Sequence, residues 1–221
     1  LRYREIVVDE LSRVCGIALK PASDLIDATQ NLDDFIEISG ALKSISVTLN
    51  KFANDLRLLS SGPGAGLNEI NLPPVQNGSS IMPGKVNPVI PEAVNQVCFN
   101  VIGNDITITM AASNGQLELN AFEPVLFYKL FESIDTMKNI LMIFADQCVA
   151  GITVNTDIMK HNLDHSTYLA TALAPVLGYQ VTAELAKEAI SRKVSMRKII
   201  LERGILTEAQ LDEIADPALY T

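Results

Sequence analysis

The sequence predicts an all-α protein, in which a bundle of long helices precedes a small helical C-terminal domain. Apolar residues recur at alternating steps of three and four along two stretches, a seven-residue repeat typical of long helices packed at a shallow angle. The two stripes are Phe35, Ile38, Leu42, Ile45, Leu49, Phe52, Leu56 and Leu59, then Phe127, Leu130, Ile134, Met137, Leu141, Phe144 and Cys148. We interpret both stripes as core, and Gly151 is placed to end the second helix.

Residues 93–117 lie between these helices and carry a single charge, Asp105. Polar side chains are nevertheless frequent there: Asn95, Gln96, Asn100, Asn104, Thr107, Thr109 and Asn114. A membrane span is expected to hold fewer such groups, because each needs a partner in lipid. We therefore expect a helix about 40 Å long that is surrounded by protein. Because this chain is too short to cover three such helices, subunits of an obligate oligomer are expected to do so.

The predicted domains are residues 1–153, a partial central bundle, and residues 154–221, a small helical domain. In the second, Asn155 is a good helix starter, Gly178 and Gly204 are helix stops, and Thr207 to Gln210 match a capping box. The opening segment is interpreted as the end of a helix that stops at Gly16. Because the sequence starts at Leu1 without signal-peptide features, we expect it to be the downstream part of a longer protein.

Composition excludes several classes of function. The chain has 221 residues, 48% of them hydrophobic, and 17 Lys and Arg against 26 Asp and Glu give a net charge of −9. This charge opposes binding to nucleic acid or to an anionic membrane surface. Cys15, Cys98 and Cys148 form no C-x-x-C pair, so neither a disulfide framework nor a zinc knuckle is predicted, and a cytoplasmic location fits best.

An eleven-residue loop, GSSIMPGKVNP at residues 78–88, interrupts the helical pattern. Gly78 and Gly84 let the main chain approach a ligand closely, and successive N–H groups of such a loop can surround an anion. Pro88 or Pro91 can open the next helix, with Asn87 as its cap, so that the positive helix end faces the loop.

The polar side chains of this loop suit a small di- or tricarboxylic acid. Lys85 adds a positive charge beside the helix end, and Ser79 and Ser80 add hydroxyl groups. Preorganised donors and cations stabilise negative charge that grows during a reaction. The same surroundings stabilise a deprotonated serine. From the residues alone, the hydroxyl could be a base, a nucleophile or a ligand.

At this loop the sequence resembles the aspartase/fumarase superfamily, whose signature has the form G-S-S-x-M-P-x-K-x-N-P. The match is complete over residues 78–88, and it extends to ANDLRLLSSGPGAGLNEINLP upstream and to PVIPEAVNQVCFNVIGND and GQLELNAFEP downstream. GKVNP is similar to the aspartase and fumarase branches. VIPEAVNQVCF and AFEP are more similar to aspartate ammonia-lyase than to fumarase.

The resemblance implies a role for each matching residue. Ser79 would be the base that removes the Cβ proton of L-aspartate, with Ser80 beside it. Lys85 and Asn87 would hold the carboxylate on which charge builds up before ammonia leaves and fumarate remains. Glu92, in the first turn of the next helix, would support the site. The reaction would need no cofactor, and no metal ligand is implied.

The resemblance also implies a homotetramer in which three subunits form each site. Gly64 stands where the family often has Arg, which puts one local contact in question. The family's upstream substrate-binding motifs, including a Thr-His pair, lie outside this sequence. We therefore expect this chain alone to have no lyase activity.

Two alternative functions remain open: a class II fumarase acting on malate, and a non-catalytic structural oligomer, as in lens crystallins of the superfamily. His161 and His165 are similar to an H-x-x-E-H zinc helix, but Asp replaces Glu and no third ligand is apparent. We interpret them as part of a solvated helix face. Glu92 could equally be a helix-dipole residue, and Cys98 and Cys148 are interpreted as small buried hydrophobes.

Overall fold

The computed structural model describes residues 2–76, 78, 81–82 and 84–216. Its elements are almost entirely helices, which confirms the all-α prediction. The chain folds as two compact units: Leu1–Ser61 with Leu72–Ile152, and Gly62–Asn71 with Thr153–Thr221. The domain boundary near residue 153 stays a prediction, and the sequence did not indicate that residues 62–71 accompany the second unit.

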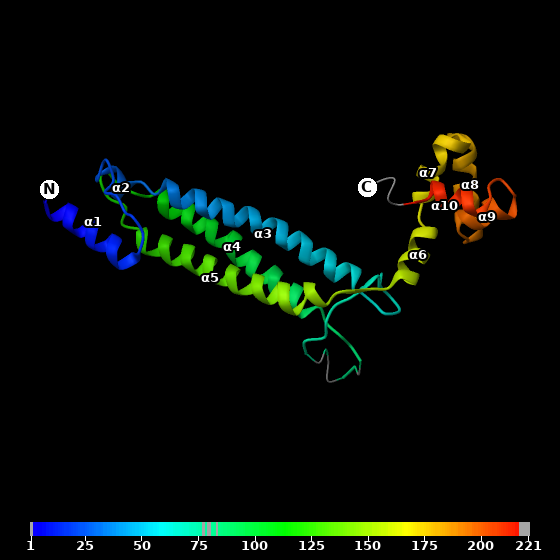
Figure 1. The fold of residues 1–221 in the computed structure, drawn as a ribbon, viewed down its shortest axis with the longest axis horizontal. Helices are drawn as coiled ribbons and strands as arrows, with labels where there is room; N and C mark the ends of the chain where they lie inside the picture. Colours follow the sequence, from blue (N-terminus) through cyan, green and yellow to red (C-terminus); the bar gives the residue numbers. More distant parts are fainter. Residues whose placement is uncertain (1, 77, 79–80, 83, 217–221) are drawn as a thin grey trace. The chain divides into compact units, whose positions relative to one another are not determined.

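The first unit is built on three long helices that run side by side (Figure 1). These are α3 (Asp33–Leu59), α4 (Val89–Ala112) and α5 (Glu123–Gln147), preceded by α1 (Arg2–Cys15) and α2 (Asp27–Gln30). Gly16 follows α1 at a φ of 68°, a left-handed conformation that ends the helix as expected. Helix α5 ends at Gln147, four residues before the predicted stop at Gly151, and a separate 3-10 turn η1 (Val149–Gly151) follows it.

The heptad stripe of α3 is only partly buried, which corrects the interpretation of the whole stripe as core. Ile38, Ile45 and Phe52 are 46%, 47% and 44% exposed. The residues buried on α3 are Ser39, Ser46, Ala53 and Leu56. Three of these are small, and they recur every seven residues beside the stripe. Small side chains let α4 approach closely at these positions, whereas Ile38, Ile45 and Phe52 of the stripe stay exposed.

The second stripe forms core within this chain over most of its length, but Ile134 and Leu141 are 37% and 38% exposed. On α5, Leu130, Met137 and Phe144 are buried, and Leu126 and Ile140 extend the buried face. Phe35 of α3 meets Phe127 edge to face, with ring centroids 4.8 Å apart. Buried residues of one cluster join the three helices at this end of the bundle: Leu32, Ile108, Ala111, Leu126 and Leu130.

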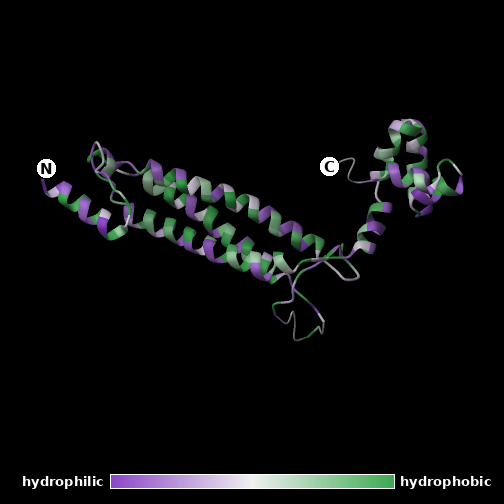
Figure 2. Ribbon diagram, in the orientation of Figure 1, coloured by the Kyte–Doolittle hydropathy of each residue, from purple (hydrophilic) through white to green (hydrophobic). Residues whose placement is uncertain are grey.

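Helix α4 is buried on one face only. Val94, Cys98, Val101 and Ile108 are buried, whereas Phe99, Ile106 and Met110 are 59%, 60% and 62% exposed. This chain alone therefore does not surround α4, in contrast to the expectation for a complete assembly. Figure 2 shows apolar residues along the whole length of α3, α4 and α5. Among the described residues, no helix is both long enough and apolar enough to cross a membrane.

The second unit contains short helices and one pair of two-residue strands. The strands β1 (Ile70–Asn71) and β2 (Thr153–Val154) pair antiparallel, which the sequence did not predict. The helices are α6 (Thr156–Asp164), α7 (Tyr168–Leu177), α8 (Tyr179–Arg192), α9 (Met196–Glu202) and α10 (Glu208–Ile214). Their core includes Leu173, Leu185, Ile199, Ile200 and Leu211.

Several helix ends in this unit follow the sequence prediction. Gly178 and Gly204, with φ of 81° and 62°, follow α7 and α9. Thr207 and Gln210 form the predicted capping box at the start of α10. Asn155 precedes α6, but its side chain makes no cap hydrogen bond there. Its amide donates instead to the Asn68 carbonyl at 2.8 Å and so holds the segment before β1.

Candidate active site

The signature loop lies at the end of the bundle where α3 ends and α4 begins (Figure 1). Ser79 and Ser80, the predicted base and its neighbour, lie outside the residues that the structure describes. The two ends of the loop are described: Gly78 on one side, and Gly84, Lys85, Val86 and Asn87 on the other.

The main chain closes the loop at Gly78. A Cβ atom at this position would lie 1.9 Å from the Lys85 carbonyl oxygen, a distance that no side chain can occupy. Gly84 turns the chain back with a φ of 81°, and the Lys85 N–H donates to the Met82 carbonyl at 3.2 Å. Both glycines are therefore needed where the sequence has them, because a side chain would obstruct or strain the turn.

Asn87 has a different local role from the one predicted. Its side-chain amide donates to the Gly78 carbonyl oxygen at 3.0 Å. Helix α4 starts at Val89 after Pro88, and no side-chain cap hydrogen bond is present at that N-cap. The prediction of Asn87 as a helix cap is thus wrong, because its donor is used to join the two ends of the loop.

The charged candidates follow one another along the chain at the start of α4. The Lys85 side chain is exposed at the end of the loop. Glu92 is half-buried in the first turn of α4, where its N–H donates to the Pro88 carbonyl at 3.0 Å. Lys85 is thereby close in sequence to a helix N-terminus, whose unpaired N–H groups carry partial positive charge. This combination favours a carboxylate ligand.

Packing beneath the loop fixes where it begins. Leu72, Pro73 and Val75 line a shallow depression together with the start of α4 and with Gln147 and Cys148 at the end of α5. A Cβ atom on Gly151 would lie 2.5 Å from Pro73 Cγ, so the glycine allows this close approach. The loop is therefore attached to two of the three bundle helices.

A buried amide that the sequence did not single out as functional secures the start of α4. Asn95 is 3% exposed, and its amide donates to Asn50 Oδ1 at 2.8 Å. Its own oxygen accepts from Arg57 Nη1 at 3.0 Å. Asn95 lies less than one turn after Glu92, so this network attaches the start of α4 to α3. The start of α4 is also where the signature loop joins the helix. The signal in the sequence was a run of amides on an otherwise apolar helix.

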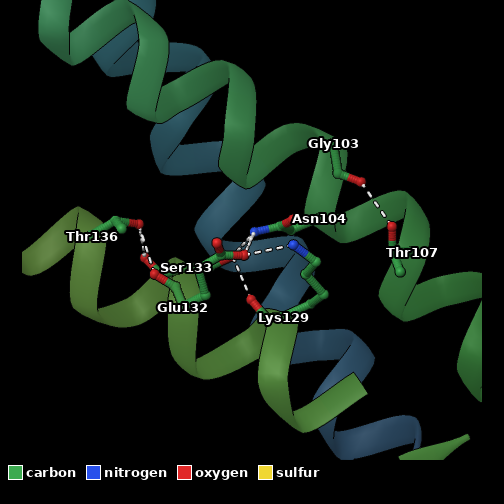
Figure 3. Close-up of polar contacts among 7 residues, drawn as sticks. All are labelled: Gly103, Asn104, Thr107, Lys129, Glu132, Ser133 and Thr136. Atoms are coloured by element: carbon green, nitrogen blue, oxygen red, sulfur yellow. Dashed lines mark hydrogen bonds and ion pairs between the residues drawn. The ribbon is translucent and has the colours of Figure 1, made fainter. Parts of the chain in front are cut away.

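Further along the bundle, polar groups join α4 to α5 (Figure 3). Asn104 donates to Glu132 Oε2 at 3.0 Å and to Ser133 Oγ at 3.1 Å, and Lys129 donates to the same Glu132 oxygen at 2.8 Å. The hydrogen bond from Lys129 lowers the pKa of the Glu132 carboxyl, with a smaller contribution from Asn104. On the α3 side, buried Asp105 accepts from Ser39 and Lys43 at 2.7 and 2.6 Å. These contacts fix how the three helices are aligned.

Neither the cysteines nor the carboxylates form a metal centre in the described part of the chain, where no three His, Cys, Asp or Glu residues are grouped to hold an ion. Burial raises the pKa of the Cys98 and Cys148 thiols, as expected for small buried hydrophobes.

Comparison with known proteins identifies the family. Residues 1–103 match a family model described as Lyase, and residues 169–220 match one described as Fumarase C C-terminus. The chain is 52% identical over 215 residues to the aspartate ammonia-lyase of Helicobacter pylori, an alignment that covers 97% of this chain and 46% of that protein. The chain belongs to the aspartase/fumarase superfamily.

Solved members of the superfamily have the same fold over this length. The fumarate lyase:delta crystallin of Brucella melitensis, solved with bound cobalt, is 49% identical with a TM-score of 0.89, covering 97% of this chain and 46% of that one. The class II fumarase of Schistosoma mansoni is 36% identical with a TM-score of 0.82, covering 96% of this chain and 46% of that one. The chain thus spans about half the length of the superfamily members it matches.

Proposed function

We propose that this chain carries the catalytic loop of an aspartate ammonia-lyase, which converts L-aspartate reversibly to fumarate and ammonia. The observation that carries the proposal is the complete match of the signature over residues 78–88, in a chain 52% identical to a curated aspartate ammonia-lyase. The enzyme is a carbon–nitrogen lyase that acts by general-base elimination.

In the proposed reaction the Ser79 oxyanion takes the proton from Cβ of L-aspartate. The electron pair of that C–H bond passes first onto the neighbouring carboxylate as an aci-carboxylate. The pair then forms the Cα–Cβ double bond as the Cα–N bond breaks and ammonia leaves. Ser79 ends the step protonated, so atoms and charge balance. Such a base contributes about 10²–10⁴-fold to the rate.

Lys85, Asn87 and Ser80 are proposed to bind the substrate. The exposed ammonium of Lys85 next to the start of α4 supports stabilisation of the growing carboxylate charge. The Asn87 side chain already joins the two ends of the loop through its hydrogen bond to the Gly78 carbonyl. We propose that Asn87 both maintains the loop conformation and contacts the substrate carboxylate. Glu92 supports the site from the first turn of α4.

The proposed assembly is a homotetramer with sites shared between subunits. Its support is the apolar surface that one chain leaves uncovered, including Ile38, Ile45 and Phe52 on α3 and Phe99 and Ile106 on α4. In each helix these residues recur every seven positions, as expected for a stripe that packs against another long helix.

A hybrid subunit tests the substrate. In it, this chain replaces the matching 215 residues of the Helicobacter pylori relative, and the unmodified relative is the control. Fumarate is measured by absorbance with L-aspartate and with L-malate as substrates. We expect turnover of L-aspartate and none of L-malate. A hybrid that assembles normally and turns over only malate would contradict the proposal.

Class II fumarase is the second candidate, because the solved Schistosoma mansoni enzyme has the same fold over this length at 36% identity. Fumarate formation from L-malate in the same assay tests this second candidate. A non-catalytic structural oligomer is the third candidate. It predicts a stable assembly without turnover of either substrate.

A further inference from the structure

A pair of histidines lies outside the signature loop, at the C-terminal end of α6 in the second unit, with His161 in the helix and His165 as its C-cap. His161 and His165 are exposed, and their ring centroids lie 4.2 Å apart at an interplanar angle of 32°. Residues four apart lie on the same face of a helix, one turn above the other. The two imidazoles therefore stand next to each other at the surface of the unit.

One ring is already oriented by the backbone. His165 Nδ1 lies 2.8 Å from the His161 carbonyl oxygen. Because a carbonyl oxygen can only accept, Nδ1 must carry the hydrogen in this contact. In the neutral imidazole this leaves the lone pair on Nε2. Histidines that bind metals commonly donate their other ring N–H to a backbone carbonyl in this manner, which fixes both tautomer and ring orientation.

We propose that His161 and His165 form a two-imidazole site for a late first-row divalent ion, with water completing the coordination. No third protein ligand is grouped with them among the described residues, so the site presents two nitrogen ligands. Imidazole suits copper, nickel and zinc, and affinity for such sites rises from cobalt to nickel to copper. Magnesium and calcium prefer oxygen ligands and are not bound.

The sequence makes this site simple to test, because the chain contains two histidines in all. The untagged chain, with exposed Cys15 replaced by Ser to remove a competing thiol, is titrated with Ni²⁺ alone by calorimetry. We expect one ion per chain, and at least tenfold weaker binding in His161→Gln and in His165→Gln. Circular dichroism verifies that these surface variants keep their helices.

The matched control is the double variant Leu163→His/His165→Gln. It keeps two histidines but separates them by two residues, which places them on different faces of α6. We expect its Ni²⁺ affinity to fall to that of the single variants. Equal affinity in this control and in the parent chain would overturn the proposal, since ring spacing would then be irrelevant.

Two spectroscopic measurements check the geometry independently. Electron paramagnetic resonance of the Cu²⁺-loaded chain should report two nitrogen ligands, and a single nitrogen would overturn the proposal. Nitrogen NMR of the metal-free chain should find His165 as the Nδ1–H tautomer. A dominant Nε2–H tautomer would contradict the orientation on which the site depends.

Discussion

Gly78 is the residue whose identity the loop geometry constrains most tightly. Because its missing Cβ would lie 1.9 Å from the Lys85 carbonyl oxygen, Gly78→Ala must separate the two ends of the loop. We predict at least a tenfold loss of aspartate turnover by the hybrid subunit, with unchanged helical content by circular dichroism.

Gly64→Ala is the control, because a Cβ atom there has open space around it and its backbone is not left-handed. This variant should keep its activity. Equal turnover by the two alanine variants would show that the approach of Gly78 to Lys85 does not determine the active loop.

Local sequence rules identified the polar residues at loop and helix ends, but not their partners. Asn87 and Asn155 both stand before a helix, where asparagine is a preferred cap. Each instead donates to a loop carbonyl, of Gly78 and of Asn68. The choice between these roles depends on which carbonyls the fold brings near, and helix-start preferences contain no such information. Thr207 and Gln210 were predicted correctly because their capping box is entirely local.

At the scale of helices, Glu132 gives the contact between α4 and α5 a dependence on pH. Lys129, and to a smaller extent Asn104, lower the pKa of this carboxyl in the folded chain. A lowered folded pKa contributes stability above the unfolded pKa of about 4.3, and that contribution is lost as pH falls through the folded value. Glu132→Gln should therefore destabilise the chain by about 0.5 kcal/mol at pH 7.

Urea unfolding of the parent and of Glu132→Gln at pH 7 and at pH 3 measures this dependence. The difference between the two proteins should shrink at the lower pH. A difference that is the same at both pH values would mean that the carboxylate charge does not contribute to the contact.

The capping box at the start of α10 should contribute measurably to the stability of the second unit. The Thr207 hydroxyl accepts from the Gln210 N–H, and Thr207→Ala removes this acceptor. We predict a loss of about 1 kcal/mol in the free energy of unfolding, measured by thermal denaturation. Thr207→Ser keeps a hydroxyl and should be close to the parent. If Ser and Ala variants are equally destabilised, the methyl group rather than the cap is responsible.

The seven-residue repeats predicted the two long helices correctly, but they did not reveal which side of each helix this chain buries. On α5 the stripe is largely core, whereas on α3 the buried residues are Ser39, Ser46, Ala53 and Leu56 beside or within it. Periodicity reports that a face is apolar, and both a neighbouring helix and another subunit can cover it. The β1–β2 pair was missed because two-residue strands have no periodicity to detect.

For the whole molecule, the exposed stripe of α3 should be an interface in the assembly. Ile45 lies at its centre, so Ile45→Lys places a charge where we expect another long helix. We predict a smaller assembly than the parent by size-exclusion chromatography with light scattering. Ser44→Lys is the control, because Ser44 lies seven residues before Lys51 and so on a face that already carries a lysine. Equal masses for both variants would argue against an interface at Ile45.

The proposed site includes residues that this chain is not expected to supply. The chain spans 46% of the Helicobacter pylori relative. We therefore predict no steady conversion of L-aspartate by the purified chain. Sustained turnover by this chain alone would contradict the proposal that residues outside it complete the active site.

The proposed role of Ser79 is tested by the rate of fumarate formation from L-aspartate by the hybrid subunit and by its Ser79→Ala variant. Ser44→Ala, an exposed serine of α3, serves as control. We predict full activity in the control and a loss of about 10³-fold in Ser79→Ala at unchanged assembly mass. An equally active Ser79→Ala variant would show that this loop does not supply the base.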